Sequence, residues 1–297
     1  MNKFRVFNTM AFVVFCLSIG QVATILLTTL FYDLNSIQIF EALRDPLHSN
    51  KSVIMFLSFS YTLLSFFLIP ITYILLYNKR SLAYLWTNNK IRFIPLLLSM
   101  VLVVSIMPLI TTLIELNHSI ELPNWLPELE LYLKQSEERA GELTNSMLSF
   151  GGINDLIITI LIMAIIPGLL EEFFFRGLVQ RQLMEILKNQ HAAVWLSAFL
   201  FSFFHFQFYG LIPRMILGSL FGYIFVWSNN IWYPCVAHVT NNLIGVLAGY
   251  FLGPKILTTE DGTMDSMALL FLSFISTFLI LLYLKRIEAA RLLIKPN

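Results

Sequence analysis

The chain has 297 residues, of which 57% are hydrophobic and 12% are charged, and its mean hydropathy is +0.75. This composition excludes an ordinary soluble domain and is typical of a membrane protein with several spans. The 19 basic and 18 acidic side chains leave a net charge of +1, so the chain lacks the positive excess that nucleic-acid binding needs. Cys16 and Cys235 both fall in apolar stretches, so we expect neither a disulfide framework nor a cysteine cage for a metal.

Eight apolar stretches are long enough, or nearly so, to cross a bilayer core about 30 Å thick. They cover residues 10–31, 53–77, 93–116, 153 to about 187, 192–209, 211–228, 231–251 and 267–284. We therefore predict an all-α fold, a polytopic transmembrane helical bundle of about eight spans, as a single membrane domain over residues 1–297. The first stretch has the length of a span and lacks a cleavage pattern, so we expect it to be retained.

The distribution of charge predicts how the bundle sits in the membrane. With eight spans, the basic residues of the short connections fall on one side, which the positive-inside rule assigns to the cytoplasm. These residues are Lys3, Arg5, Lys79, Arg80, Lys90, Arg92, Arg181, Lys188, Lys285, Arg286, Arg291 and Lys295. We expect both termini to be cytoplasmic in a multi-pass protein of the plasma membrane, and the compact loops favour a bacterial source.

The connection over residues 117–150 is acidic, which suits the opposite face of the membrane. Its second half, residues 128–148, is polar and favours a helix. That helix is interpreted either as an amphipathic surface helix or as a solvated connector.

Ionisable residues inside a membrane are costly, so they indicate where function resides. The fourth stretch places Glu171, Glu172 and Arg176 directly after an apolar run, and three charges in six residues cannot face lipid at mid-bilayer. Glu172 and Arg176 are four residues apart and can pair, whereas Glu171 points about 100° away around the helix. An unpaired carboxylate in a low-dielectric setting is a candidate general base, and a charged helix end at the interface is the alternative.

Two further clusters lie in later stretches. Phe201 and His205 belong to the fifth stretch, and His238 and Asn242 share one helical face in the seventh. A histidine and an amide on one face can stabilise a developing oxyanion. At about 1.5 Å per residue from the cytoplasmic end, Glu171 lies about 25 Å deep, His205 about 20 Å, Asn242 about 17 Å and His238 about 11 Å. These depths are compatible with one site.

The three clusters, in this order and on separate spans, resemble the CPBP family of CAAX proteases and bacteriocin-processing enzymes, which includes the type II CAAX prenyl endopeptidases. The matching residues are Glu171, Glu172 and Arg176 for EExxxR, Phe201 and His205 for FxxxH, and His238 and Asn242 for HxxxN. Each motif alone is weak, but the ordered set is specific. It defines a predicted catalytic core over residues 153–249, about a third of the chain.

The resemblance implies a membrane-embedded endopeptidase that hydrolyses a peptide bond of a membrane-associated or prenylated-type protein or peptide. Glu171 and His205 would activate water, and His238 with Asn242 would stabilise the tetrahedral intermediate. The partners implied are this substrate and the lipid bilayer.

Glu172 and Arg176 would then support the helix and the charge of Glu171. The family is described both as metalloproteases and as metal-independent glutamate proteases. By residue type, Glu171, His205 and His238 would suit Zn²⁺ as a cofactor, although their spacing is not HExxH. The expectation is therefore that no metal is obligatory, with zinc as the alternative.

Two other classes of function remain open from the residues. A non-catalytic membrane maturation or immunity scaffold would have the same fold, and a proton-coupled transporter would use the same ionisable residues, although no inverted repeat is visible. Arg214 opens the sixth stretch with no assigned role. Gly218 and Gly222 form a small-xxx-small pair, which indicates close helix packing rather than a substrate groove.

Overall fold

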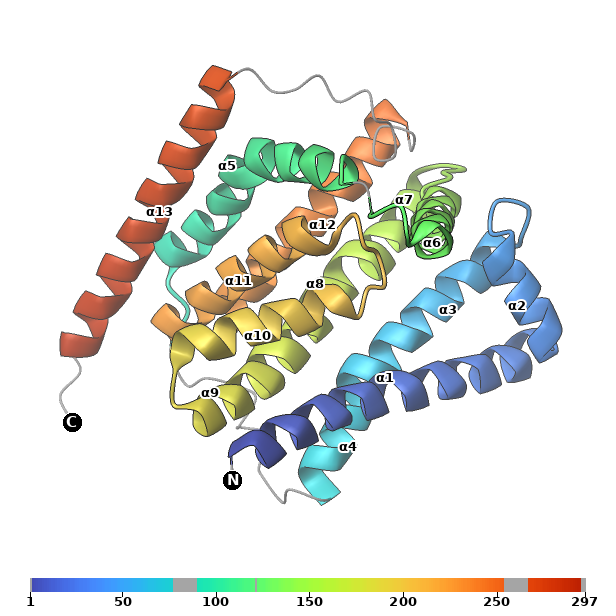
Figure 1. The fold of residues 1–297 in the computed structure, drawn as a ribbon, viewed down its shortest axis with the longest axis horizontal. Helices are drawn as coiled ribbons and strands as arrows, with labels where there is room; N and C mark the ends of the chain where they lie inside the picture. Colours follow the sequence, from blue (N-terminus) through green and yellow to red (C-terminus); the bar gives the residue numbers. More distant parts are fainter. Residues whose placement is uncertain (1, 77–89, 121, 254–266, 295–297) are drawn as a thin grey trace.

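The computed structural model describes residues 2–76, 90–120, 122–253 and 267–294, and within these ranges the chain is helical without strands (Figure 1). In chain order the elements are α1 (Asn2–Tyr32), α2 (Ser36–Arg44), α3 (Lys51–Leu63), η1 (Leu64–Leu68), α4 (Ile69–Leu76), α5 (Phe93–His118), α6 (Pro127–Met147), α7 (Ile153–Thr159), η3 (Ile160–Ile165), α8 (Ile166–Glu172), η4 (Phe173–Gln180), α9 (Arg181–Leu187), α10 (Gln190–Phe203), α11 (Leu211–Ser228), α12 (Trp232–Leu252) and α13 (Met267–Ile294). The predicted all-α fold is confirmed.

Within the described ranges, seven helices are long and apolar enough to cross a membrane. They are Arg5–Tyr32, Lys51–Leu76, Phe93–His118, Ile153–Leu187, Leu211–Ser228, Trp232–Leu252 and Met267–Ala289. The predicted stretch 192–209 is not among them, because its helix, α10, has 14 residues and already ends at Phe203. Such a helix is about 21 Å long, which is shorter than the bilayer core.

A turn over residues 204–210 replaces the end of that predicted span. The side-chain Nδ2 of Asn117 on α5 donates hydrogen bonds to the carbonyls of Phe208, at 3.0 Å, and Tyr209, at 2.5 Å. Phe206 has φ 53°, a left-handed conformation that is strained for a bulky residue. Polar contacts to a neighbouring helix therefore end α10 although its sequence is apolar enough to continue.

The helices pack with the long helix of α7 to α9 near the middle of the bundle (Figure 1). α12 packs against α5, η3 and α8, α10 packs against α11, α1 packs against α3 and η1, and α13 packs against α5. The start of α1 and the end of α13 lie at one end of the bundle in Figure 1, together with the connection between α9 and α10. Which face of the membrane this end occupies stays a prediction, and Lys79, Arg80 and Lys295 lie outside the described residues.

The long helix is continuous from Ile153 to Leu187, but it contains two π-helical stretches, η3 and η4, on either side of α8. η3 ends two residues before Pro167, and η1 likewise ends two residues before Pro70. Because proline lacks an N–H and its ring clashes with the carbonyl four residues back, a wider turn before it relieves the helix. The helix is therefore locally widened, not broken, around the two glutamates of α8.

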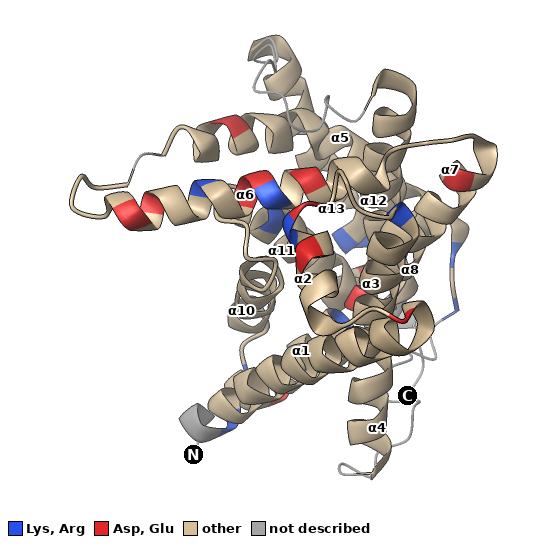
Figure 2. Ribbon diagram, turned by 90° about the vertical axis from the view of Figure 1, so that its right-hand side faces the viewer, with Lys and Arg blue, Asp and Glu red and all other residues tan. Residues whose placement is uncertain are grey.

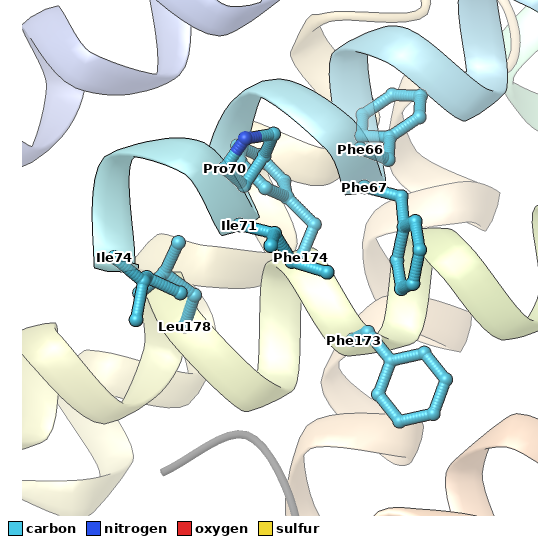
Figure 3. Close-up of a pocket in the computed structure, with 8 residues that line it drawn as sticks. All are labelled: Phe66, Phe67, Pro70, Ile71, Ile74, Phe173, Phe174 and Leu178. Carbon is cyan, nitrogen blue, oxygen red and sulfur yellow. The ribbon is translucent and has the colours of Figure 1, made fainter. Parts of the chain in front are cut away.

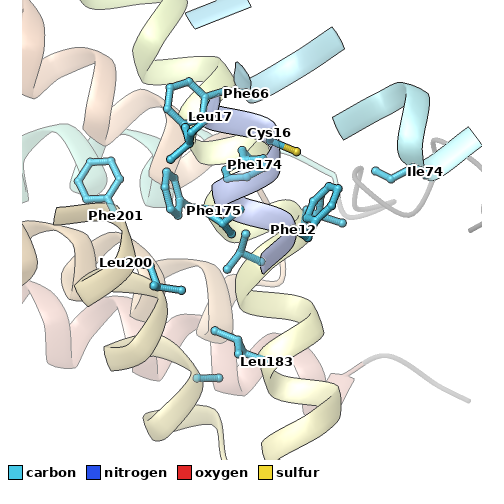
Figure 4. Packing of buried hydrophobic residues seen from close by; sticks show 14 residues of the cluster. Phe12, Cys16, Leu17, Phe66, Ile74, Phe174, Phe175, Leu183, Leu200 and Phe201 are labelled. Atoms are coloured by element: carbon cyan, nitrogen blue, oxygen red, sulfur yellow. The ribbon is translucent and has the colours of Figure 1, made fainter. Parts of the chain in front are cut away.

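The largest apolar cluster joins α1 to the aromatic residues that follow these glutamates (Figure 4). Phe174 lies 6.3 Å from Phe12 and 5.5 Å from Phe66, measured between ring centroids. Cys16 is a buried free thiol in this cluster, and Cys235 is also buried and free. The phenylalanines thus fix the long helix against the first two spans.

The acidic connection forms the predicted helix, α6, which carries charges of both signs, whereas α1 has almost none beyond its first turns (Figure 2). Met147, at its end, is buried against Ile54 and Met55 of α3. Trp125, Leu131 and other residues around its start are exposed. α6 is therefore exposed at its start and buried against α3 at its end.

Candidate active site

The two glutamates of α8 lie inside the bundle because α8 crosses α12 at very short range. A Cβ atom at Gly168 would lie 2.8 Å from the backbone nitrogen of Val239, so only glycine permits this approach. Glu172 is fully buried and Glu171 is 8% exposed. The crossing puts both carboxylates opposite His238, which precedes Val239 on α12.

Glu172 is the centre of the polar cluster. Its Oε1 accepts a hydrogen bond from Nη1 of Arg176 at 2.9 Å and another from Nδ1 of His238 at 2.9 Å. All three side chains are buried. The predicted pairing of Glu172 with Arg176 is confirmed, and the contact with His238 adds a second helix to it.

His238 also faces Glu171, with 3.9 Å between its Nε2 and Oε2 of the carboxylate. Its ring is held by two aromatic side chains, stacked on Phe221 at 5.4 Å and edge-on to Phe201 at 5.7 Å. The histidine therefore lies between the two carboxylates, with one ring nitrogen directed at each. A carboxylate and an imidazole in this arrangement can exchange protons with a bound reactant.

Arg176 is neutralised by Glu172 and fixed by α11. Its Nη2 donates to the carbonyl of Gly218 at 2.8 Å, and its guanidinium lies over the rings of Phe201, at 5.0 Å, and Phe221, at 5.7 Å. These contacts replace part of the hydration energy that a cation loses when it is buried.

One turn later on the long helix, the same kind of contact is repeated. Nε2 of Gln180 donates to the carbonyl of Gly222 at 3.1 Å. A Cβ at Gly222 would lie 2.7 Å from Oε1 of Gln180, and one at Gly218 would lie 3.3 Å from Arg176. The interpretation of Gly218 and Gly222 as a close-packing pair is confirmed.

His205 belongs to the turn after α10 and is half-buried. Its Nδ1 lies 2.7 Å from the carbonyl oxygen of Phe201, which orients the ring, and its ring centroid lies 4.9 Å from that of Phe201. The ring of Phe201 thus contacts His205, His238 and Arg176. This phenylalanine brings two of the predicted histidines to one aromatic side chain.

Asn242 lies one helical turn beyond His238 on α12, where its Oδ1 accepts a hydrogen bond from Asn241 at 3.1 Å. Among the described residues, no hydrogen bond joins Asn242 to Glu171, Glu172 or His238. The depths counted along the sequence made His238 the shallowest of the four residues, yet its Nε2 lies 3.9 Å from Oε2 of Glu171. Counting residues assumes upright helices, whereas a helix of 35 residues is about 52 Å long and must tilt or extend beyond the bilayer core.

The residues proposed as metal ligands do not form a metal site in the described part of the chain. A catalytic zinc ion needs three protein ligands around one point, and the described residues contain no group of three His, Cys, Asp or Glu side chains that meets this requirement. We therefore derive no step through a metal ion.

Two groups that contact the polar cluster lie outside the three sequence motifs. Phe221 and the backbone carbonyl of Gly218 come from α11, which carries none of the three motifs. The signal available in the sequence was the glycine pair, which predicted that α11 approaches another helix closely. It did not reveal that the helix approached would be the one that carries Arg176.

An apolar pocket lies beside the polar cluster, between the second span and the beginning of η4 (Figure 3). Its lining contains only apolar side chains, which are Phe66, Phe67, Pro70, Ile71, Ile74, Phe173, Phe174 and Leu178. Phe173 directly follows Glu172 in the chain. The glutamates therefore lie at a boundary between a polar cluster and aromatic surface.

Comparison with known proteins supports the resemblance drawn from the motifs. Residues 153–244 match the family described as Rce1-like, type II CAAX prenyl endopeptidase. No curated protein and no solved structure matches the chain. The matched region contains the three motifs and α11. It supports, at the level of the family, a CAAX-type intramembrane endopeptidase.

Proposed function

We propose, with the Rce1-like region as the premise, that this protein hydrolyses a peptide bond of a membrane-associated or prenylated-type protein or peptide, with Glu171 as the base. One observation carries the proposal. Two adjacent buried carboxylates have different partners, because Glu172 accepts from Arg176 and His238, whereas Glu171 faces the second nitrogen of His238 at 3.9 Å. Glu171 is therefore the carboxylate available to a reactant.

In the proposed reaction, Glu171 accepts a proton from water while the water oxygen attacks the carbonyl carbon of the substrate. His205 takes part by orienting the water. The C–N bond then breaks, and the proton held by Glu171 passes to the departing amine. Burial favours this chemistry, because fixed charges act more strongly where water is excluded.

His238 and Asn242 are proposed to stabilise the oxyanion of the tetrahedral intermediate. Because a carboxylate only accepts, Nδ1 of His238 is the donor in its bond to Glu172. Nε2 donates to an oxyanion when the ring holds both protons. Asn242, one turn away on the same face, would add an amide donor once substrate is present.

The first test is cleavage of a quenched, membrane-anchored peptide library by the purified protein in nanodiscs. Glu171→Gln is expected to lower the rate by at least about 100-fold, the contribution typical of a general base. Glu130→Gln is the control, because it removes a carboxylate on α6 that lies outside the polar cluster. Parallel reactions with a chelator, followed by added zinc, separate a glutamate mechanism from a metal-dependent one.

Cleavage by Glu171→Gln and His205→Ala at the wild-type rate would contradict the proposal. In that case the maturation or immunity scaffold becomes the better account of the fold. The scaffold hypothesis predicts that both variants keep the biological effect of the wild-type protein.

A further inference from the structure

Arg214 is a second arginine near the site, and the proposed chemistry does not use it. It lies in the first turns of α11, where its Nη2 donates to Oε1 of Gln207 at 2.6 Å. A Cβ at Gly210 would lie 2.9 Å from that Nη2 and 3.2 Å from Cζ and Nη1. The absence of a side chain at Gly210 therefore makes room for the guanidinium above the turn over residues 204–210.

The other terminal nitrogen of this guanidinium, Nη1, is buried and has no hydrogen-bond partner among the described residues. A buried donor without a partner is costly, and the cost is larger for a charged group. Arg176 differs, because both of its terminal nitrogens are bonded, to Glu172 and to the carbonyl of Gly218. Within the part of the chain that the structure describes, Arg214 therefore retains a terminal donor without an acceptor, whereas Arg176 leaves only its Nε without one.

The turn beneath Arg214 links it to the active site. Its partner Gln207 follows His205 by two residues in the turn after α10. Glu137 on α6 reaches Nε2 of Gln207 at 3.5 Å through its Oε1, and so contacts the residue that orients Arg214. Through Gln207 the arginine is thus joined both to the turn that holds His205 and to α6.

We propose that Arg214 binds a carboxylate of the substrate and so selects which peptides reach Glu171. This inference rests on the proposed function. A guanidinium with an unused donor matches the planar carboxylate group and can bond it through two parallel N–H groups. The carboxylate is either the C-terminus of the substrate or an Asp or Glu side chain near the scissile bond.

The test uses one peptide that the wild-type protein cleaves, resynthesised in matched pairs. One pair differs only in a C-terminal acid or amide, and a second differs only in Asp or Asn at one position. The wild type is expected to cleave the acid member of one pair about 10- to 100-fold better in kcat/KM, which is the effect of a charge-assisted bond. The pair that shows the preference identifies the source of the carboxylate.

Arg214→Gln is expected to abolish this preference, because cleavage of the acid peptide falls toward that of the neutral one. Arg214→Lys retains the charge but loses the planar fork, so it is expected to keep part of the preference. Arg139→Gln, an exposed arginine of α6, is the control and should keep all of it. An Arg214→Gln protein that lowers cleavage of both members equally, or retains the preference, overturns the inference.

A binding measurement separates this inference from the proposed function. The same peptide pairs are titrated into Glu171→Gln protein, with and without Arg214→Gln, and this readout requires no catalysis. Tighter binding of the acid, lost in the double variant, supports the role of Arg214 even if Glu171 is not the base. Equal binding of acid and neutral peptides by Glu171→Gln overturns it, even if Glu171 proves essential.

Discussion

Two ion pairs with the same spacing lie in different surroundings, one on α6 and one on the long helix of the active site. Glu130 and Lys134 pair at 2.6 Å, with 24% and 60% of their side chains exposed. Glu172 and Arg176 pair at 2.9 Å, with 0% and 1% exposed. Both are glutamates followed by a cation four residues later, but Glu172 follows an apolar run and Glu130 stands in a polar stretch.

The difference shows what burial adds to an ion pair. In water the attraction is screened and the side chains lose freedom, so the pair on α6 contributes little. Inside the bundle each charge has lost its hydration, and it is tolerated because hydrogen bonds from other helices replace the water. Arg176 has such a bond to the carbonyl of Gly218 on α11, and Glu172 has one from His238 on α12.

The largest expected effect comes from removing the buried cation. Arg176→Met leaves Glu172 buried with His238 as its remaining bonded partner, so we expect a loss of about 3–5 kcal/mol in the free energy of unfolding. Lys134→Met, the matched change on α6, should cost no more than about 0.5 kcal/mol. Chemical unfolding in detergent measures both.

The double variant Glu172→Gln with Arg176→Met sharpens this result. Because it removes both charges, it should be more stable than Arg176→Met alone. Equal losses for Arg176→Met and Lys134→Met would show that burial does not distinguish the two pairs.

The next effect tests the crossing that creates the buried environment. Gly168→Ala places a Cβ against the backbone of Val239. We therefore expect the free energy of unfolding to fall by about 1–3 kcal/mol and the contact between His238 and the glutamates to weaken. Gly245→Ala on α12 is the control, since no atom lies within 4 Å of its Cβ. It should be neutral or stabilising by up to about 1 kcal/mol, because alanine favours a helix. Unfolding free energies that fall equally in both variants would be evidence against a special close approach at Gly168.

A smaller effect is expected where two helices are joined by neutral polar groups. Oγ of Ser105 on α5 lies 2.5 Å from Oγ of Ser276 on α13, and Ser273 donates to the carbonyl of Ser105 at 2.7 Å. Since serine leaves no charge behind, Ser276→Ala should cost about 0.6 kcal/mol, the average for hydrogen bonds between membrane helices. A loss as large as that of Arg176→Met would mean that the serine contact, and not the charged cluster, dominates the stability of the bundle.

The smallest effect concerns an exposed pair between α2 and α3, where Nδ1 of His48 lies 2.8 Å from Oδ1 of Asp45. This hydrogen bond raises the pKa of His48 and lowers the pKa of Asp45. The stabilisation by His48 is present below its ordinary pKa, about 6.5, and is lost as the pH rises through the raised value. The stabilisation by Asp45 is present above about pH 3.9 and is lost as the pH falls through the lowered value.

The NMR titration of His48 checks this pair. Its pKa should return toward the ordinary value in Asp45→Asn. An unchanged titration in that variant would mean that another group perturbs the histidine.

Much of the architecture was predictable, because a bilayer requires apolar helices of a minimum length and makes internal charges conspicuous. The motif residues Glu171, Glu172, Arg176 and His238 were all named from the sequence, and the structure brings these four together. The end of α10 was not predictable, since the hydrogen bonds from Asn117 that fix the following turn come from a helix about 90 residues earlier.

The sequence by itself determined the class of fold, the pairing of Glu172 with Arg176 and the resemblance to the endopeptidase family. These depend on composition, helical periodicity and local spacing, which are properties of neighbouring residues. Only the tertiary structure decided which nitrogen of His238 faces which glutamate, that Phe201 and Phe221 hold its ring, and that α11 receives Arg176. These contacts join residues on separate helices. Their distances depend on how the helices cross and tilt, and counting residues along one helix does not reveal that.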